Sequence, residues 1–267
     1  MSMMQITFLG TGTSTGIPQI GCTCPVCTST DPRDSRLRTS AIVEIEGKNI
    51  LIDCGPDFRQ QMLRFHIKRI DAVLVTHIHY DHTGGIDDLR PFGENGTVPI
   101  YLEPSVAEGI RNRLPYCFAD HRYPGVPNIC LQEIGLSPFL IEGIEIVPIR
   151  VMHYKLPIFG YRIGRFAYIT DALTIPESEY EKLKDIDVLV VNALRKKPHL
   201  SHQTLADALR IIARVGPREA YLVHMSHHMG LTSEVEKELP AHVHFAYDGL
   251  VIDLSLIHIS EPTRLRR

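Results

Sequence analysis

The chain has 267 residues, of which 44% are hydrophobic and 22% are charged, and its formal net charge is -3. A chain of this length and hydrophobic content buries a sizeable core, which excludes a largely disordered protein. The mildly acidic balance argues against a protein that holds extended nucleic acid through a broad basic surface. The N-terminus lacks the pattern of a signal peptide, and no apolar run is long enough to cross a bilayer, so we expect a cytoplasmic protein without a membrane partner.

The first predicted elements flank a loop that is rich in cysteine. Residues 5–12 (QITFLGTG) read as a strand that runs into a glycine-rich turn, and residues 40–55 read as a hairpin of two strands. The loop between them carries three thiols within six positions: Cys22, Cys24 and Cys27. In a reducing compartment such a cluster favours a metal site over disulfides, but the loop offers no fourth cysteine to complete it.

A cluster of histidines follows the next strand. A helix is predicted over residues 57–67 and a short apolar strand over 71–77, which leads into the sequence THIHYDH. This sequence supplies three imidazoles and a carboxylate: His77, His79, Asp81 and His82. Four such groups beside a buried strand are too costly to bury for packing alone, so they indicate a metal site. Alternating residues of an extended chain point the same way, so His77 and His79 converge on one ion, whereas the following turn directs the other two residues to a second ion.

The remaining elements alternate between strands and helices. Gly84 and Gly85 predict a tight turn in which backbone passes close to the histidines. Hairpin-like runs of strands interrupted by helices predict a layered α/β fold in a single domain over residues 1–254. Residues 255–267 do not continue the pattern and are expected to form a disordered or non-native tail. Beyond Gly85 we expect strands at 98–103, 144–151, 159–164, 165–170, 186–194 and 219–225, helices from Pro104 and over 201–215, and an irregular loop or lid at 115–128.

The HxHxDH sequence after an apolar strand, together with the preceding LIDCG at residues 51–55, resembles the metallo-β-lactamase superfamily. The resemblance implies a four-layer αββα sandwich of the α/β class, with a two-metal site at one edge of the sheets. It also implies three further ligands at the ends of later strands: His153, Asp171 and His224. By this resemblance one ion is held by His77, His79 and His153, the other by Asp81, His82 and His224, and Asp171 bridges both.

The expected chemistry follows from these ligands. Imidazole and carboxylate groups suit Zn2+, Mn2+ or Fe2+. Two such cations lower the pKa of a shared water until it is hydroxide at neutral pH, and hydrolysis is therefore the expected reaction. Asp53 in LIDCG is expected either to orient a ligand histidine from outside or to cap the turn, and Asp248 is a weaker candidate of the same kind.

A histidine at position 202, the GTG start, the C-x-C-x-x-C cluster and the AYDG end resemble the phosphodiesterase branch of the superfamily, which includes the phosphoribosyl 1,2-cyclic phosphate phosphodiesterases. The resemblance implies a dinuclear metal-dependent phosphodiesterase that hydrolyses a small phosphodiester substrate, linear or cyclic, to a phosphomonoester. Asp81 and His202 are the expected catalytic residues, and His202 is the general acid that protonates or stabilises the leaving oxygen. The alternative for His202 is an imidazole in solvent, next to a helix that its neighbour Ser201 caps.

Two other members of the superfamily stay open as alternatives. The transfer-RNA 3′-processing endonucleases share the feature at His202, but they carry a long basic arm that is not evident in this sequence. The pyrroloquinoline quinone biosynthesis factor B group shares the cysteine cluster. Hydrolysis is not the assigned task of that group and its ligand set is usually depleted, whereas the full set is present here.

The phosphodiesterase branch also suggests a fourth ligand for the three cysteines. By resemblance His227 completes a closed structural zinc site with Cys22, Cys24 and Cys27. His228 is the runner-up, and the alternative is a cysteine-rich turn that binds no metal. We therefore expect two active-site ions, Zn2+ or Mn2+, and one structural Zn2+. A homodimer is the expected oligomeric state, because dimers are the commonest oligomers of soluble proteins.

Overall fold

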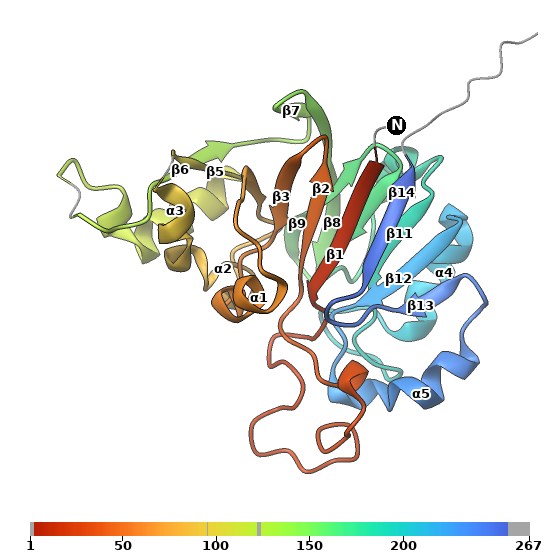
Figure 1. The fold of residues 1–267 in the computed structure, drawn as a ribbon. Helices are drawn as coiled ribbons and strands as arrows, with labels where there is room; N and C mark the ends of the chain where they lie inside the picture. The colour runs from red at the N-terminus through yellow and green to blue at the C-terminus, as the bar shows by residue number, and fades with distance from the viewer. Residues whose placement is uncertain (1–2, 95, 122–123, 256–267) are drawn as a thin grey trace, which may run out of the picture.

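Two seven-stranded sheets form the centre of the computed structural model, which describes residues 3–94, 96–121 and 124–255 (Figure 1). In spatial order, the first sheet contains β14 (Val251–Ser255), β1 (Met3–Gly10), β2 (Ser40–Ile45), β3 (Lys48–Ile52), β4 (Ala72–Leu74), β5 (Val98–Leu102) and β6 (Ile129–Glu133). The second sheet contains β13 (Val243–Phe245), β12 (Glu219–Val223), β11 (Val188–Asn192), β10 (Phe166–Ile169), β9 (Leu156–Ile163), β8 (Ile144–His153) and β7 (Phe139–Ile141).

Helices cover the outer faces of both sheets (Figure 1). The α-helices are α1 (Phe58–Phe65), α2 (Tyr80–Thr83), α3 (Pro104–Arg113), α4 (Leu205–Val215) and α5 (Thr232–Val235). Short 3₁₀ segments occupy Pro32–Asp34, Ile86–Gly93, Pro115–Cys117, Glu177–Leu183, His227–Met229 and Glu236–Glu238. Within the part of the chain that the structure describes, no helix is both long and apolar enough to span a membrane.

Three hydrophobic clusters define the layers. The central cluster joins the inner faces of the two sheets and includes Phe8 from β1, Tyr161 from β9 and Tyr168 from β10. A second cluster packs α4 against the second sheet, and a third packs α1 and α3 against the first sheet. The period-two alternation of strand side chains produces this division, because Ile50 and Ile52 face the central cluster and Leu51 faces the helices. The four-layer αββα sandwich expected from the sequence is therefore confirmed.

Strand direction brings the predicted ligands to one edge. Strands β3, β4 and β5 run parallel, and so do β10, β11, β12 and β13. The carboxyl ends of parallel strands lie at the same edge of a sheet, which is where α/β folds place their ligands. Asp53 follows β3, Asp171 comes two residues after β10 and His224 follows β12, while His153 is the last residue of β8.

Several boundaries differ from those predicted. The helix expected over 201–215 begins only at Leu205, because the Thr204 side chain caps it in a reciprocal capping box with Asp207. Ser201 is therefore not the cap. The strands β6, β7, β13 and β14 were not predicted, since each is short. Of the expected tail, Ser255 still belongs to β14, and residues 256–267 lie outside the described residues.

The turn at Gly84 and Gly85 lies in close backbone contact with the turn after β3, which contains Gly55, and so passes close to the histidines, as predicted. A Cβ atom on Gly85 would lie 2.1 Å from the carbonyl oxygen of Gly55, and one on Gly55 would lie 2.1 Å from the carbonyl oxygen of Asp81. Backbone hydrogen bonds from Cys54 to His82 and from Gly85 to Cys54 hold the two turns together. Only glycine permits this approach, so the turn after β3 and the turn after the motif position one another.

The substitution Gly85→Ala is expected to lower the free energy of unfolding by about 1–3 kcal/mol, because the added methyl group forces the two turns apart. Urea unfolding of the purified variant measures this loss. Gly135→Ala is the matched control, since a Cβ atom there meets nothing within 4 Å and the change should stay within about 0.5 kcal/mol. Equal losses for the two variants would contradict the close contact.

Candidate metal centre

Seven side chains gather at the edge of the sheets in two adjoining groups. Within each group, the potential ligand atoms lie within 4.8 Å of one another. The first group is His77, His79 and His153, and the second is Asp81, His82, Asp171 and His224. These are the two sets expected from the sequence, with Asp171 placed beside the second. Asp171 also lies within the same distance of His153 and His202, and its bridging role stays a prediction.

Three strand ends at this edge adopt an unusual backbone conformation. Asp53, Asp171 and His224 have φ angles of 62°, 56° and 58°, in the left-handed region that residues other than glycine seldom occupy. Such strain is found mainly where the surrounding structure requires a particular side-chain direction. Here it turns the chain sharply after each strand, so that the side chain of Asp171 or His224 faces the centre.

Hydrogen bonds from outside the two groups fix the tautomers of three imidazoles. His82 Nδ1 lies 2.7 Å from Asp53 Oδ2, and His153 Nδ1 lies 2.9 Å from the carbonyl oxygen of Ser201. The Thr76 hydroxyl donates to Asp53 (2.9 Å) and therefore accepts from His77 Nδ1, also at 2.9 Å. In all three rings Nδ1 carries a proton, which leaves Nε2 as the nitrogen that could bind a cation.

Of the two alternatives for Asp53, the geometry supports the outer carboxylate. Its side chain is fully buried and accepts hydrogen bonds from the Thr76 backbone N–H (2.8 Å) and the Thr76 hydroxyl, in addition to the contact with His82. Asp248 lies elsewhere: it accepts from the Thr11 hydroxyl (2.8 Å) and the Leu37 backbone N–H (2.7 Å). Asp248 therefore stabilises the N-terminal turn and does not contact the ligand histidines.

The Nε2 atoms of His82 and His224, both in the second group, lack hydrogen-bond partners. His82 Nε2 lies 3.2 Å from an oxygen of Asp81 and 3.2 Å from an oxygen of Asp171 without hydrogen-bond geometry. His224 Nε2 lies 3.1 Å from Asp171 Oδ1 and is likewise unsatisfied. Buried polar atoms are almost always hydrogen-bonded, so this exception needs an explanation. Nitrogen and carboxylate oxygen atoms directed at a common point are the donor set of a divalent cation, and these residues fit one.

The buried carboxylates and imidazoles of the centre shift one another's pKa values. Burial alone would raise the pKa of the Asp171 carboxyl, but the positive charges of His224 and His82 hold it well below its usual value. Burial, together with the charge of His82, lowers the pKa of His77 well below its usual value. Burial would also lower the pKa of His82, but Asp171, Asp53 and Asp81 raise it well above its usual value. Without a cation, a proton on His82 therefore neutralises part of the charge of three buried carboxylates.

His202 lies beside both groups. The residue is 9% exposed, its ring centroid lies 4.5 Å from that of His153 and 4.9 Å from that of His224, and Nδ1 lies 3.7 Å from Asp171 Oδ1. Burial, followed by the charge of His224, lowers the pKa of His202 to about 3. At neutral pH the side chain is therefore a neutral imidazole, and it lies at the site and not in solvent.

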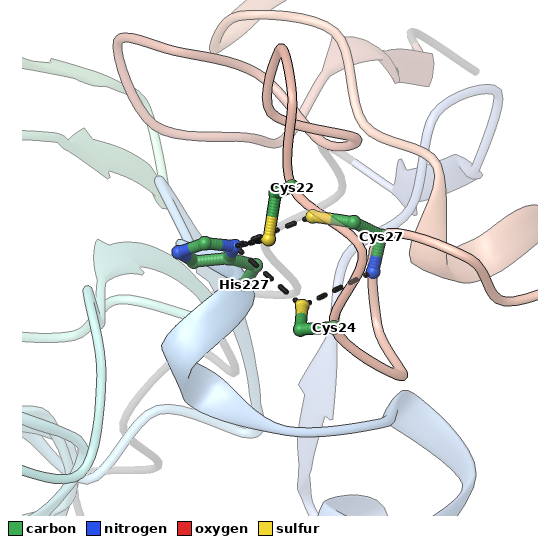
Figure 2. Close-up of side chains that lie close together, drawn as sticks. All are labelled: Cys22, Cys24, Cys27 and His227. Atoms are coloured by element: carbon green, nitrogen blue, oxygen red, sulfur yellow. Dashed lines mark hydrogen bonds between the residues drawn. The ribbon is translucent and has the colours of Figure 1, made fainter.

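The three cysteines surround His227 (Figure 2). Its Nδ1 atom lies 3.1 Å from Cys22 Sγ, 3.6 Å from Cys24 Sγ and 3.2 Å from Cys27 Sγ. With the usual Zn–S and Zn–N bond lengths, sulfur and nitrogen ligands of a tetrahedral zinc lie about 3.6 Å apart. His228 contacts the far side of the His227 ring, with 3.0 Å between the two Nε2 atoms, and the structure brings it to none of the cysteines.

The cysteine loop and the strand of His224 are joined by backbone contacts as well. Thr13 donates its N–H to the carbonyl oxygen of Met225 (2.9 Å), and Met225 donates to that of Thr11 (3.2 Å). Met225 directly follows His224, and His227 comes two residues later. A metal ion held by the cysteines and His227 would therefore clamp the segment that presents His224 to the second group.

Comparison with known proteins agrees with this geometry. Residues 48–225 match the β-lactamase superfamily domain family. A crystal structure described as a new diphosphatase from the PhnP family is 37% identical, with a TM-score of 0.89, and the match covers 95% of this chain and 98% of that one. The chain therefore belongs to the β-lactamase superfamily, in the branch that contains the PhnP family, as the sequence motifs predicted.

Two curated relatives extend the comparison. An octanoyltransferase of Porphyromonas gingivalis is 46% identical over 97% of this chain, but the match covers 54% of that protein. A coenzyme PQQ synthesis protein B of Methylobacterium nodulans is 34% identical, and the match covers 82% of this chain and 79% of that protein. The chain spans about half the length of the first curated relatives that it matches, which include ribonuclease Z proteins.

The substitution Cys24→Ser is expected to remove one bound zinc ion per chain and to lower the free energy of unfolding by at least about 2 kcal/mol, because binding at a structural site contributes directly to folding. Elemental analysis and urea unfolding of the purified variant measure the two losses. Cys130→Ser is the control, since Cys130 lies outside the described metal groups. Zinc content that is unchanged in Cys24→Ser would refute the structural site.

Proposed function

We propose that the chain is a dinuclear metal-dependent phosphodiesterase that hydrolyses a small phosphodiester, linear or cyclic, to a phosphomonoester. The observation that carries the proposal is the complete seven-residue donor set in two adjoining groups, with the His202 imidazole beside both. Divalent cations bound there, Zn2+ or Mn2+, would supply an activated water and would neutralise charge on the phosphate oxygens. A structural Zn2+ at the cysteine site belongs to the same proposal.

The residues of the chain have distinct tasks in this reaction. Asp53, Thr76 and the Ser201 carbonyl hold three imidazoles in the tautomer that binds metal. Asp81 takes part in catalysis through its place in the second group. Burial alone would raise the pKa of its carboxyl, but the charge of His82 holds this pKa well below its usual value. The neutral His202 imidazole offers one N–H to an oxygen of the phosphate or to the leaving oxygen, where developing charge strengthens the hydrogen bond.

The PhnP-family relative supports a phosphorus substrate. It is described as a diphosphatase, and in-line attack at phosphorus breaks a P–O–P bond by the same chemistry as a P–O–C bond. A transfer-RNA 3′-processing endonuclease is less favoured, because the net charge is -3 and the sequence offers no long basic arm. A non-hydrolytic role of the PQQ factor B type is less favoured because the donor set is full.

A cytoplasmic location, a homodimer, and the absence of membrane or extended nucleic-acid partners complete the proposal.

Protein loaded with Mn2+ or Zn2+ is expected to hydrolyse bis(p-nitrophenyl) phosphate. Asp171→Ala should lower kcat/KM by at least about a thousandfold, because it removes a carboxylate that both groups face.

His202→Gln should lower kcat by roughly 100-fold or more while metal content stays unchanged, because only the hydrogen bond to the reacting phosphate is lost. Release of p-nitrophenolate and elemental analysis measure these effects. Faster turnover of β-lactams or thioesters than of any phosphodiester would contradict the proposal.

A further inference from the structure

His79 differs from the other two imidazoles of the first group in what holds it. The residue is exposed, whereas His77 and His153 are buried. Those two rings each donate Nδ1–H to an oxygen atom outside the group, but Nδ1 of His79 lies 3.0 Å from His77 Nε2, on the side of the centre. In the described part of the chain, no hydrogen bond joins the Nε2 atom of His79 to a protein group. The position of this ring therefore depends on the backbone that carries it.

Both peptide groups that flank the Cα atom of His79 are held by side chains. Arg113 Nη2 donates to the carbonyl oxygen of Ile78 (3.2 Å), and Arg113 Nη1 donates to the Thr83 hydroxyl (2.6 Å). That hydroxyl lies 2.9 Å from the carbonyl oxygen of His79 and 3.1 Å from that of Ile78. Because it has a single proton, it donates to the nearer His79 carbonyl. One guanidinium group is therefore connected, directly or through Thr83, to the peptide on each side of His79.

Helix α3 fixes the place of this guanidinium group. The buried face of the helix packs against the first sheet, and Arg113 is its last residue. The helix also approaches the ligand segment closely, since a Cβ atom on Gly109 would lie 2.8 Å from Ile78 Cδ1. Beyond the helix, Tyr116 donates its hydroxyl to Asp87 (2.7 Å) in the 3₁₀ segment that follows the histidine motif. Arg113 therefore lies between two further contacts that join the same two segments.

The charge of Arg113 is not used in an ion pair. Among the described residues no carboxylate lies within ion-pair distance of its guanidinium group, whereas Arg111 on the same helix pairs with Glu133 at 2.9 Å. A positive charge near a metal centre opposes the binding of cations by Coulomb repulsion. If Arg113 favours metal binding, it does so through the geometry of its hydrogen bonds, because its charge acts in the opposite direction.

We propose that Arg113 is a positioning residue for the metal centre, which holds His79 in place through Thr83 and the Ile78 carbonyl. The inference rests on the proposed function, because it requires an ion in the first group. Arg113 itself binds neither the ion nor the substrate in this role. Hydrogen bonds that orient metal ligands from outside contribute about ten- to hundredfold to metal affinity. Here such bonds act on the backbone of the ligand, in place of its ring.

The experiment is a calorimetric titration of Mn2+ into protein that has been freed of active-site metal by dialysis against a chelator. Thiolates select softer ions than Mn2+, so the titration reports on the seven-residue centre and not on the cysteine site. The wild-type protein should bind two ions per chain. Arg113→Met should weaken one of them by about ten- to hundredfold and leave the other nearly unchanged. The loss of positive charge alone would strengthen the binding of both.

Matched variants separate positioning from charge and from folding. Arg111→Met removes the same charge from the same end of α3 and should leave both affinities nearly unchanged. Thr83→Val should weaken the same ion as Arg113→Met, and the double variant should lose less than the sum of the two single losses, because both break one connection. Thr83→Ser keeps the hydroxyl and should retain the affinity. Without metal, Arg113→Met should unfold at the same urea concentration as the wild type, because its side chain is exposed.

The outcomes distinguish the inference from the proposed function. Unchanged or tighter Mn2+ binding in Arg113→Met overturns the inference and leaves the metal centre intact. Equal weakening of both ions with a lower urea midpoint shows a general structural role and likewise overturns it. A wild-type protein that binds no Mn2+ overturns the metal centre, and the inference with it. Weakening of one ion in Arg113→Met and Thr83→Val, but not in Arg111→Met or Thr83→Ser, supports the inference.

Discussion

Three carboxylates buried around one histidine set the central constraint on this fold. Asp53, Asp81 and Asp171 all face His82, and all are at least nine-tenths buried together with it. Carboxylates in such surroundings destabilise a fold unless positive charge accompanies them. A second proton on His82 supplies part of that charge when no cation is bound, and divalent cations would supply it when they bind. The stability of the sheet edge would then depend on the same ions as its chemistry.

The rest of the structure positions the ligands around this charge. Parallel strands deliver their ends to one edge, and left-handed residues at Asp53, Asp171 and His224 turn the chain there. The glycine contacts between the turns after β3 and after the histidine motif fix Asp53 against His82. A metal ion held by the three cysteines and His227 would add a second fixed point behind His224.

Much of the centre could be predicted from the sequence because its spacing is local. The residues from His77 to His82 are adjacent, and their arrangement follows from a strand that ends in a turn. The later ligands, His153, Asp171 and His224, could be placed only through the family resemblance, since a single histidine or aspartate after a strand is common. The same holds for His227, which lies 200 residues from Cys27 and contacts it at 3.2 Å.

Other features could not be predicted, because they depend on contacts between distant segments. The hydrogen bond from His153 to the Ser201 carbonyl involves a backbone atom, which carries no signal in the sequence. The neutral state of His202 follows from burial beside His153 and His224, and burial is a property of the folded chain. The start of α4 was misplaced because Ser201 and Thr204 are both good caps, and only the reciprocal bond with Asp207 decides between them.

Anomalous X-ray diffraction at the zinc edge, from crystals of zinc-loaded protein, would locate the ions of the proposed centre. We expect two peaks roughly 3.5–4 Å apart within the seven-residue centre, which is the separation of paired catalytic ions. One ion should contact His77, His79 and His153, and the other Asp81, His82 and His224. A filled cysteine site with no peak, or only one, inside the seven-residue centre would contradict the account.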